Sequence, residues 1–297
     1  MKSIPGIDRH LKTNFAVLKP VRIESNHFDP GSTMFTRWLG EIPVFKGFIF
    51  VLLMMLVSSM ALAQSNYSTA KAFDALFRWM PFLLKSGFFF NILISLMVMF
   101  IGTVTGIALG LGQISIHGWL RRFCYMITQF FRNSPWLVLL FVVMLAFPFE
   151  VNIFGVSIYV PDWVKAVIGL SLPIMANISE IVRGAVLSVP SGQWEAAESL
   201  AYTRLQTLWK IILPQCFKRM IPPWMNWYAI LTMATPLVSI LGVEDILKLS
   251  RDAMEAEGNH PELLMPFYTF ILVLFFIYCY PIAKWTQRLE RKFIVKS

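Results

Sequence analysis

Long apolar runs separated by short polar stretches dominate this chain of 297 residues. A membrane-crossing helix needs about 20 consecutive, mostly apolar residues. Six runs reach roughly that length, and they cover residues 44–63, 87–112, 124–147, 163–187, 221–242 and 265–284. The runs are continuously apolar and do not alternate, which favours helices over the strands of a membrane barrel. The pattern therefore predicts an all-α integral membrane protein with about six transmembrane helices.

Composition and charge agree with a membrane protein. Hydrophobic residues make up 57% of the chain and charged residues only 14%, which is more apolar surface than a soluble domain of this length can bury. If the N-terminus is cytoplasmic, most of the 26 lysines and arginines lie on the cytoplasmic side of the six spans. This is the positive-inside pattern. Because the basic residues are spread over every cytoplasmic segment, they argue against a nucleic-acid partner.

The two ends of the chain differ from the apolar centre. Residues 1–42 mix charges with Pro, Gly and Ser and predict a poorly ordered, basic cytoplasmic arm. Residues 43–63 predict an additional N-terminal helix. Its end, Ala61-Leu62-Ala63, has the form of a signal-peptidase site, but the long arm before it favours an uncleaved anchor. Residues 286–297 predict a basic cytoplasmic tail.

The sequence offers no pattern for catalysis, for a cofactor or for a metal. The three cysteines have no metal-binding or redox spacing, and the four histidines fall outside the predicted spans. No Ser-His-Asp set and no paired intramembrane Asp is visible, so a membrane-embedded enzyme ranks lowest. There is no G-x-x-x-x-G-K-[ST] loop, so we do not expect the chain to hydrolyse ATP itself.

A polar, helix-forming segment lies between two spans, within a cytoplasmic loop over 188–220. Ser191 is expected to cap a helix whose first turn includes Glu195, a favourable position for an acidic side chain. The helix then has a small apolar face made of Ala196, Ala197 and Leu200. Such a face can press into the groove of a partner protein. The alternative is an amphipathic helix that lies on the membrane. The segment carries few basic residues, so its attraction to lipid headgroups is weak, which argues against this alternative.

Several polar residues lie within or at the ends of the predicted spans. Arg132 lies near the cytoplasmic face beside Pro135, where a helix begins or kinks, and is either an interfacial anchor or functional. Glu180 and Arg183 are three residues apart on one helix face and can pair, as a structural ion pair or as a gating element. Polar or adaptable residues inside spans are candidates for a solute pathway, namely Asn177, Met233, Thr235 and Ser239.

Two further patterns concern packing and the outer surface. Gly102, Gly106 and Gly110 form a ridge that permits close helix approach, and packing within the chain is favoured over a dimer contact. Residues 243–264 carry more acidic than basic side chains. They predict either a short helix that faces an external partner or a solvated loop.

With these residues in view, the chain resembles a permease of the polar amino acid uptake family of ABC transporters over residues 87–285. The resemblance rests on short motifs in collinear order: Phe131–Pro135 for an FRGTP-like box, Glu180–Gly184 for E-I-x-R-G, Val189–Ala197 for VPxGQxEAA, Leu213–Gln215, Pro222-Pro223, and Leu237–Ile240. The chain departs from the family at Ala201, where glycine is usual, at Met233–Leu237, which replaces a charged stretch, and at Ala176-Asn177.

The resemblance implies a five-helix ABC importer permease core over 86–285, with an EAA coupling loop over 189–215, plus the extra N-terminal helix. It implies that a cytoplasmic ABC ATPase dimer docks on this loop, through Gly192, Glu195, Ala196, Ala197, Leu200 and Ala201. It also implies a second permease subunit, identical or related, and a periplasmic or extracellular solute-binding protein. The expected function is ATP-driven import of a small polar solute, an amino acid, across the bacterial inner membrane.

Two other functions remain as alternatives. A secondary transporter driven by an ion gradient would need membrane-buried carboxylates, and four of the predicted spans contain none in their cores. A transport-inactive membrane scaffold is the other alternative, if the departures at Ala201 and in 233–236 have removed transport.

Overall fold

The computed structural model describes residues 49, 53, 69–153 and 156–293. The chain divides into two units, Met1–Met54 and Met55–Ser297. Of the first unit, only Ile49 and Leu53 are described, and both are helical. The predicted arm over 1–42 lies outside the described residues.

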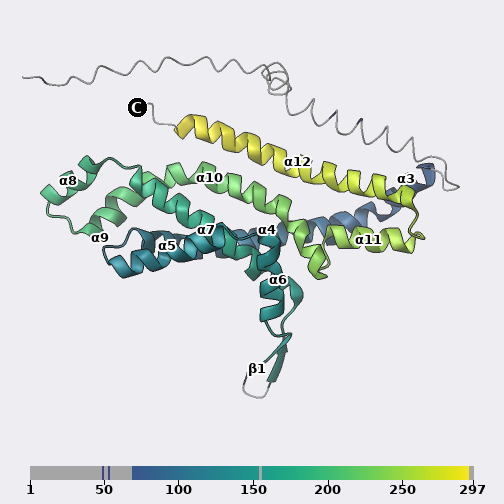
Figure 1. The fold of residues 1–297 in the computed structure, drawn as a ribbon. Coiled ribbons are helices and arrows are strands. Elements are labelled where there is room, and N and C mark those ends of the chain that lie inside the picture. The colour runs from purple at the N-terminus through teal and green to yellow at the C-terminus, as the bar shows by residue number, and fades with distance from the viewer. Residues whose placement is uncertain (1–48, 50–52, 54–68, 154–155, 294–297) are drawn as a thin grey trace, which may run out of the picture. The chain divides into compact units, whose positions relative to one another are not determined.

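Helices form nearly all of the described part of the second unit (Figure 1). In chain order the elements are α3 (Thr69–Phe82), the π-helix η1 (Leu83–Phe88), α4 (Phe89–Gln113), α5 (Gly118–Arg132), α6 (Trp136–Ala146), β1 (Glu150–Ile153), β2 (Val156–Tyr159), α7 (Asp162–Leu187), α8 (Ser191–Ser199), α9 (Arg204–Thr207), the π-helix η2 (Leu208–Ile212), α10 (Leu213–Ala234), the 3₁₀-helix η3 (Thr235–Leu241), α11 (Ile246–Ala256) and α12 (Pro261–Phe293).

The described residues contain four helical stretches long and apolar enough to cross a membrane, namely Ala70–Gln113, Asp162–Leu187, Arg204–Leu241 and Pro261–Lys292. The bent pair α5–α6 is a fifth span if it is counted as one. This confirms the predicted all-α membrane class. The sixth predicted span, over 44–63, lies outside the described residues except for Ile49 and Leu53.

The helix that contains the predicted span 87–112 begins much earlier, at Thr69. α3 continues through η1 into α4, although its sequence is too polar to form an apolar run. The physical reason is amphipathicity: α3 buries Ala72, Ala75 and Leu76 in a cluster shared with α11 and α12. The predicted outer loop between the first two spans is therefore largely helical.

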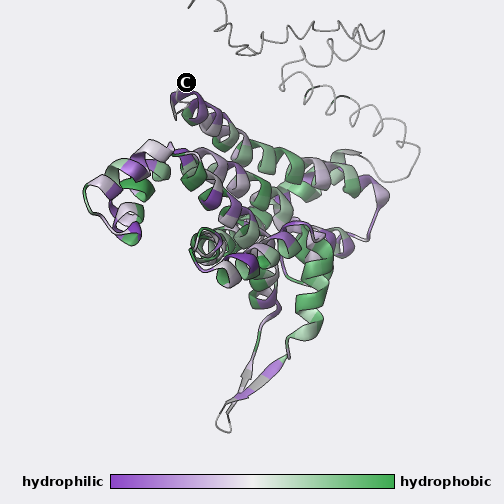
Figure 2. Ribbon diagram, turned by 60° about the vertical axis from the view of Figure 1, so that its left-hand side comes forward, coloured by the Kyte–Doolittle hydropathy of each residue, from purple (hydrophilic) through white to green (hydrophobic). Residues whose placement is uncertain are grey.

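The predicted span 124–147 is broken rather than straight. α5 and α6 meet at an angle of 105°. Ser134 lies outside both helices because the residue before a proline is disfavoured in the helical conformation, and Pro135 then starts α6. Figure 1 shows α6 running crosswise to α4 and α7, with the β1–β2 hairpin at its far end. Figure 2 shows that α6 is hydrophobic along its length.

The glycine ridge of α4 packs against α7, in the most extensive helix contact of the described bundle. A Cβ added at Gly102 would meet Ile174, one at Gly106 would meet Ile178, and one at Gly110 would meet Val182, each at 2.8 Å or less. The contacts advance by four residues on both helices, so α4 and α7 run parallel with one small residue per turn at their interface. The prediction of packing within the chain is confirmed.

The acidic segment 243–264 contains α11, so the helical alternative is confirmed for part of it. Asp245 caps this helix, is fully buried, and accepts a hydrogen bond from the backbone amide of Lys248 at 2.9 Å. Asn91 donates to Asp245 at 3.3 Å and accepts from the Ile246 amide at 3.0 Å. Burial raises the pKa of Asp245 to about 6, although these hydrogen bonds and Arg251 act in the opposite direction.

Candidate functional site

The predicted coupling segment folds as the α8–α9 loop, residues 189–215, which lies at one end of the bundle (Figure 1). α8 follows α7 after a short turn, and α9 leads through η2 directly into α10. Pro190 precedes α8 and no side chain caps the helix. Ser191 is the first helical residue, so the prediction that it caps the helix was wrong. The fixed φ of proline starts the helix instead.

α8 ends in a turn that requires a left-handed residue, and Ala201 supplies it with a φ of 57°. The Tyr202 amide donates to the Ala197 carbonyl at 3.1 Å, and the Ala201 amide donates to the Glu198 carbonyl at 2.9 Å. These two bonds form a Schellman motif, whose left-handed position is usually glycine. Ala201 therefore adopts the left-handed conformation without being glycine and carries backbone strain, because its Cβ crowds this conformation.

The two faces of α8 have different surroundings. Gly192, Glu195 and Ala196 are exposed, and Glu195 and Ala196 flank the face of Gly192 because they follow it by three and four residues. Leu200 continues this face at the end of the helix and is 72% exposed. Ala197 is only 1% exposed, so its side chain packs within the chain.

The α8–α9 loop is anchored firmly to the bundle. A buried cluster joins the end of α7 to η2 and α10, and consists of Ala185, Val186, Val189, Ile212 and Cys216. Trp194 packs against this cluster from α8. Arg219 of α10 donates to both the carbonyl and the hydroxyl of Ser188, at 2.9 Å each. Apolar packing and hydrogen bonds therefore both attach the loop to α7 and α10.

Large apolar side chains remain exposed beyond α8. Leu205 of α9 is 65% exposed and Trp209 of η2 is 57% exposed. Neither was singled out from the sequence, because helical spacing alone does not show which side of a four-residue helix its neighbours cover. An exposed apolar surface beside a polar rim is typical of a protein contact.

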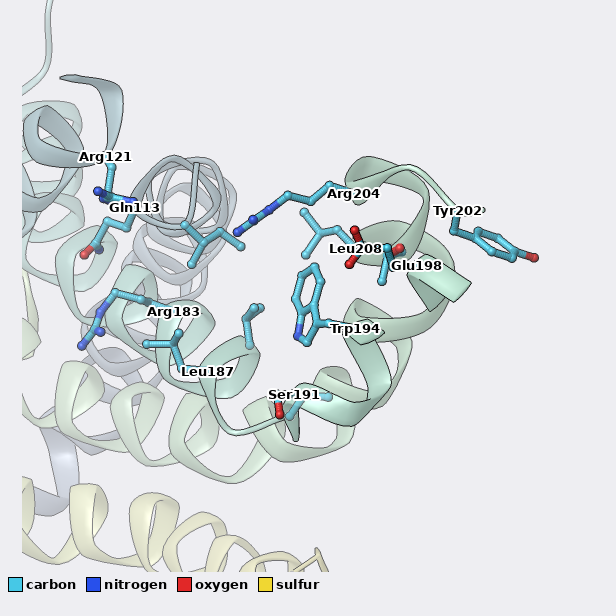
Figure 3. Close-up of a pocket in the computed structure, with 14 residues that line it drawn as sticks. Gln113, Arg121, Arg183, Leu187, Ser191, Trp194, Glu198, Tyr202, Arg204 and Leu208 are labelled. Carbon is cyan, nitrogen blue, oxygen red and sulfur yellow. The ribbon is translucent and has the colours of Figure 1, made fainter. Parts of the chain in front are cut away.

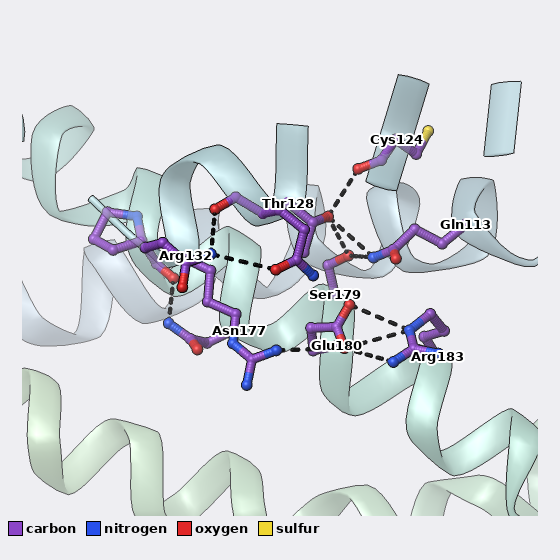
Figure 4. Close-up of polar contacts among 11 residues, drawn as sticks. Gln113, Cys124, Thr128, Arg132, Asn177, Ser179, Glu180 and Arg183 are labelled. Atoms are coloured by element: carbon purple, nitrogen blue, oxygen red, sulfur yellow. Dashed lines mark hydrogen bonds and ion pairs between the residues drawn. The ribbon is translucent and has the colours of Figure 1, made fainter. Parts of the chain in front are cut away.

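Arg132, Glu180 and Arg183 form a polar cluster between α5 and α7 (Figure 4). Arg183 binds Glu180 closely, with Nη2 to Oε2 at 2.7 Å and Nε to Oε1 at 3.2 Å. Arg132 Nη1 lies 3.6 Å from the same carboxylate. The pairing of Glu180 with Arg183 was predicted, whereas the contact with Arg132 was not, because 48 residues separate the two in the sequence.

A second buried polar set joins three helices beside this cluster (Figure 4). Gln113 of α4 donates to Ser179 of α7 at 2.5 Å and to Thr128 of α5 at 3.0 Å. All three side chains are buried. None of the three was predicted from the sequence, although a polar residue on the apolar side of each helix was the available signal.

The candidate pathway residues do not share one environment. Asn177, Thr235 and Ser239 are buried and donate to backbone carbonyls three or four residues earlier, each at 2.8 Å. Met233 is 56% exposed. Across residues 69–153 and 156–293, no group of three or more His, Cys, Asp or Glu is placed to hold a metal ion.

Sequence comparison identifies relatives over most of the chain. The profile of the family described as "Binding-protein-dependent transport system inner membrane component" matches residues 102–294. The probable amino-acid ABC transporter permease protein YckA of Bacillus subtilis is 33% identical over 213 residues, which cover 72% of this chain and 89% of the relative. The L-cystine transport system permease protein TcyB of the same organism is 29% identical, over 71% of this chain and 86% of the relative.

Solved structures share the fold at lower sequence identity. A crystal structure of an amino acid ABC transporter with histidines matches with a TM-score of 0.63 and 20% identity, over 77% of this chain and all of that chain. An inward-facing MetNI methionine ABC transporter matches with a TM-score of 0.57 and 23% identity, over 72% of this chain and 97% of that one. Together with the α8–α9 loop and the multi-pass bundle, these matches show that the chain belongs to the binding-protein-dependent inner membrane components, the permease subunits of ABC transporters.

Proposed function

We propose that this permease imports a small polar solute, an amino acid, and that a separate ATPase drives it through the exposed face of α8. The relatives named as amino-acid permeases support the substrate class. The observation that carries the proposal is the geometry of the α8–α9 loop. The loop presents Gly192, Glu195, Ala196 and Leu200 outward while its other side is anchored to two long helices.

The exposed face has the chemistry of a helix that docks in a groove. Gly192 and Ala196 add little bulk, so another surface can approach the helix closely, and Leu200 provides an apolar anchor. Leu205 and Trp209 extend the apolar area toward α10. Ala197 contributes indirectly, because its burial holds α8 against the chain. Closure of an ATPase dimer that grips this face would pull on α7 and α10 and switch the accessible side of the pathway.

The remaining partners follow from the same function. The fully apolar α6 exposes Val138, Val142 and Leu145. A second permease subunit, identical or related, would cover part of this surface and complete one pathway, with lipid covering the rest. A solute-binding protein would dock at the opposite end of the bundle from α8. We place Asn177, Met233, Thr235 and Ser239 in the pathway, where a solute can replace the local carbonyl bonds of the three polar residues.

Co-purification from native membranes tests the proposal. The tagged wild type is expected to retain an ATPase, and Glu195→Arg and Ala196→Arg are expected to lose it. Both residues are exposed, so neither change disturbs the packing of the loop. Glu198→Arg is the matched control for Ala196→Arg, because Glu198 follows Ala196 by two residues and therefore lies on the opposite side of α8, where it lines a cavity between the loop and the bundle. If the wild type retains no ATPase, or if all three variants retain it, the coupling assignment fails and an ion-driven transporter or a scaffold gains support.

A further inference from the structure

A basic cavity lies between the α8–α9 loop and the ends of α4, α5 and α7 (Figure 3). Its volume is about 810 Å³, within the roughly 300–1,000 Å³ that is typical of small-molecule sites. Arg121 of α5, Arg183 of α7 and Arg204 of α9 line it, against one acidic residue, Glu198. The cavity thus carries an excess of positive charge.

Two of these arginines lack an acidic partner. Among residues 69–153 and 156–293, the ion pairs of the structure join other side chains, and neither Arg121 nor Arg204 takes part in one. Arg204 instead lies over the ring of Trp194, with its guanidinium carbon 5.6 Å from the ring centroid. Figure 3 shows Arg204 extending from the α9 side toward Gln113 and Arg121. The free guanidinium groups are suited to a phosphate, which they bind with paired hydrogen bonds.

A third group in the cavity lacks a partner of its own. Gln113 is 4% exposed, and its amide nitrogen is used by Thr128 and Ser179. Its carbonyl oxygen Oε1 is buried and has no hydrogen-bond partner in the described part of the chain. A buried acceptor of this kind is costly unless a donor such as a hydroxyl reaches it. The cavity therefore offers guanidinium donors for an anion, and the unsatisfied oxygen of Gln113 is buried behind its wall.

We propose that this cavity binds the phosphate group of an anionic membrane lipid headgroup, such as phosphatidylglycerol. The cavity lies where the membrane-crossing helices α4 and α7 end, which is the depth of headgroups in a bilayer. Part of its wall is apolar, formed by Ile114, Val186, Leu187 and Leu208, and suits the glycerol backbone of a lipid better than a free ion. Basic pockets between helices on the cytoplasmic side are a known form of lipid recognition.

The bound headgroup has a structural consequence for the loop. It bridges Arg204 of the α8–α9 loop to Arg121 of the bundle, so it fixes the loop in addition to the apolar anchor. This inference rests on the proposed function only for its orientation, in which the loop faces the cytoplasm. The lipid experiment below needs no ATPase, so its failure is distinguishable from failure of the coupling assignment.

The test is lipid binding to the full-length chain in detergent, measured by native mass spectrometry during titration with phosphatidylglycerol or phosphatidylcholine. The wild type is expected to retain phosphatidylglycerol and to release phosphatidylcholine. The double variant Arg121→Gln with Arg204→Gln is expected to bind phosphatidylglycerol about 30-fold more weakly, because each basic residue near a lipid surface contributes about a fivefold factor. Arg122→Gln with Lys210→Gln is the matched control, since it removes the same charge from neighbouring positions that do not line the cavity.

Two outcomes would overturn the proposal. The double variant and the control could bind phosphatidylglycerol equally. Millimolar inorganic phosphate could displace the lipid, which would make a soluble anion the occupant. Hydrogen exchange gives a second readout: phosphatidylglycerol should slow exchange of the backbone amides in 200–207 of the wild type and of the control, and leave the double variant unchanged.

Discussion

Replacement of Gly106 by alanine tests the packing of α4 against α7 most directly. The new Cβ would lie 2.7 Å from Ile178 Cβ and 2.7 Å from the carbonyl oxygen of Met175. Ordinary contacts of this kind are 3.4–4 Å, and a helix carbonyl cannot rotate away as a side chain can. The two helices must therefore separate by several tenths of an ångström. Overpacking of this kind costs about 1–3 kcal/mol.

Gly184→Ala is the matched control for this change. Gly184 lies in α7, and an added Cβ there meets no atom within 4 Å. Each substitution gains about 1 kcal/mol of helix propensity, so this gain cancels when the two variants are compared. Gly106→Ala should therefore have a free energy of unfolding about 1–3 kcal/mol below that of Gly184→Ala.

The assay is unfolding of the purified protein in mixed detergent micelles, followed by circular dichroism. Equal free energies of unfolding for the two variants would refute the packing argument. A variant Gly106→Ala that keeps its stability but loses its association with a second permease would refute it as well, because the ridge would then be a contact between subunits.

Three further predictions concern the loop, the polar cluster and α11. Ala201→Gly should relieve about 1 kcal/mol of left-handed strain and slow hydrogen exchange of the amides that close the turn after α8; faster exchange would contradict this. Arg183→Gln should lower the thermal midpoint more than Arg132→Gln, because Arg183 donates directly to Glu180 and Arg132 lies 3.6 Å away; the reverse order would contradict it. The raised pKa of Asp245 means that the folded state binds more protons than the unfolded state between pH 3.8 and about 6. The free energy of unfolding should therefore fall by about 3 kcal/mol as the pH rises through that window. Asp245→Asn should remove this pH dependence, which unfolding titrations at pH 4 and pH 7 would measure.

Features that depend on local spacing were predictable from the sequence. Four of the six apolar runs coincide with membrane helices of the described residues, because about 20 apolar residues are needed to cross a bilayer. Gly102, Gly106 and Gly110 repeat every four residues, so they had to form one ridge. Glu180 and Arg183 were expected to pair because residues three apart share a helix face. Each of these conclusions needs only the geometry of a single helix.

Features that depend on residues distant in the sequence required the tertiary structure. Pro135 indicated a helix start or kink, but the 105° turn of α6 depends on what surrounds it. The sequence placed Ala196 and Ala197 on one apolar face, whereas the anchoring of α8 through Trp194 leaves the first exposed and buries the second. Arg132 reaches Glu180, and Arg204 shares a cavity with Arg121, only because packing brings different helices together.

The division has a physical cause. Hydrophobicity and helical period act over a few residues, so the sequence by itself determined four of the membrane-spanning helices, the glycine ridge and the existence of a polar helix between two spans. Which side of each helix is buried, and which charges lie close together, depends on contacts between helices that are many residues apart in the chain. Only the tertiary structure decided these, because such contacts depend on how all the helices pack at once.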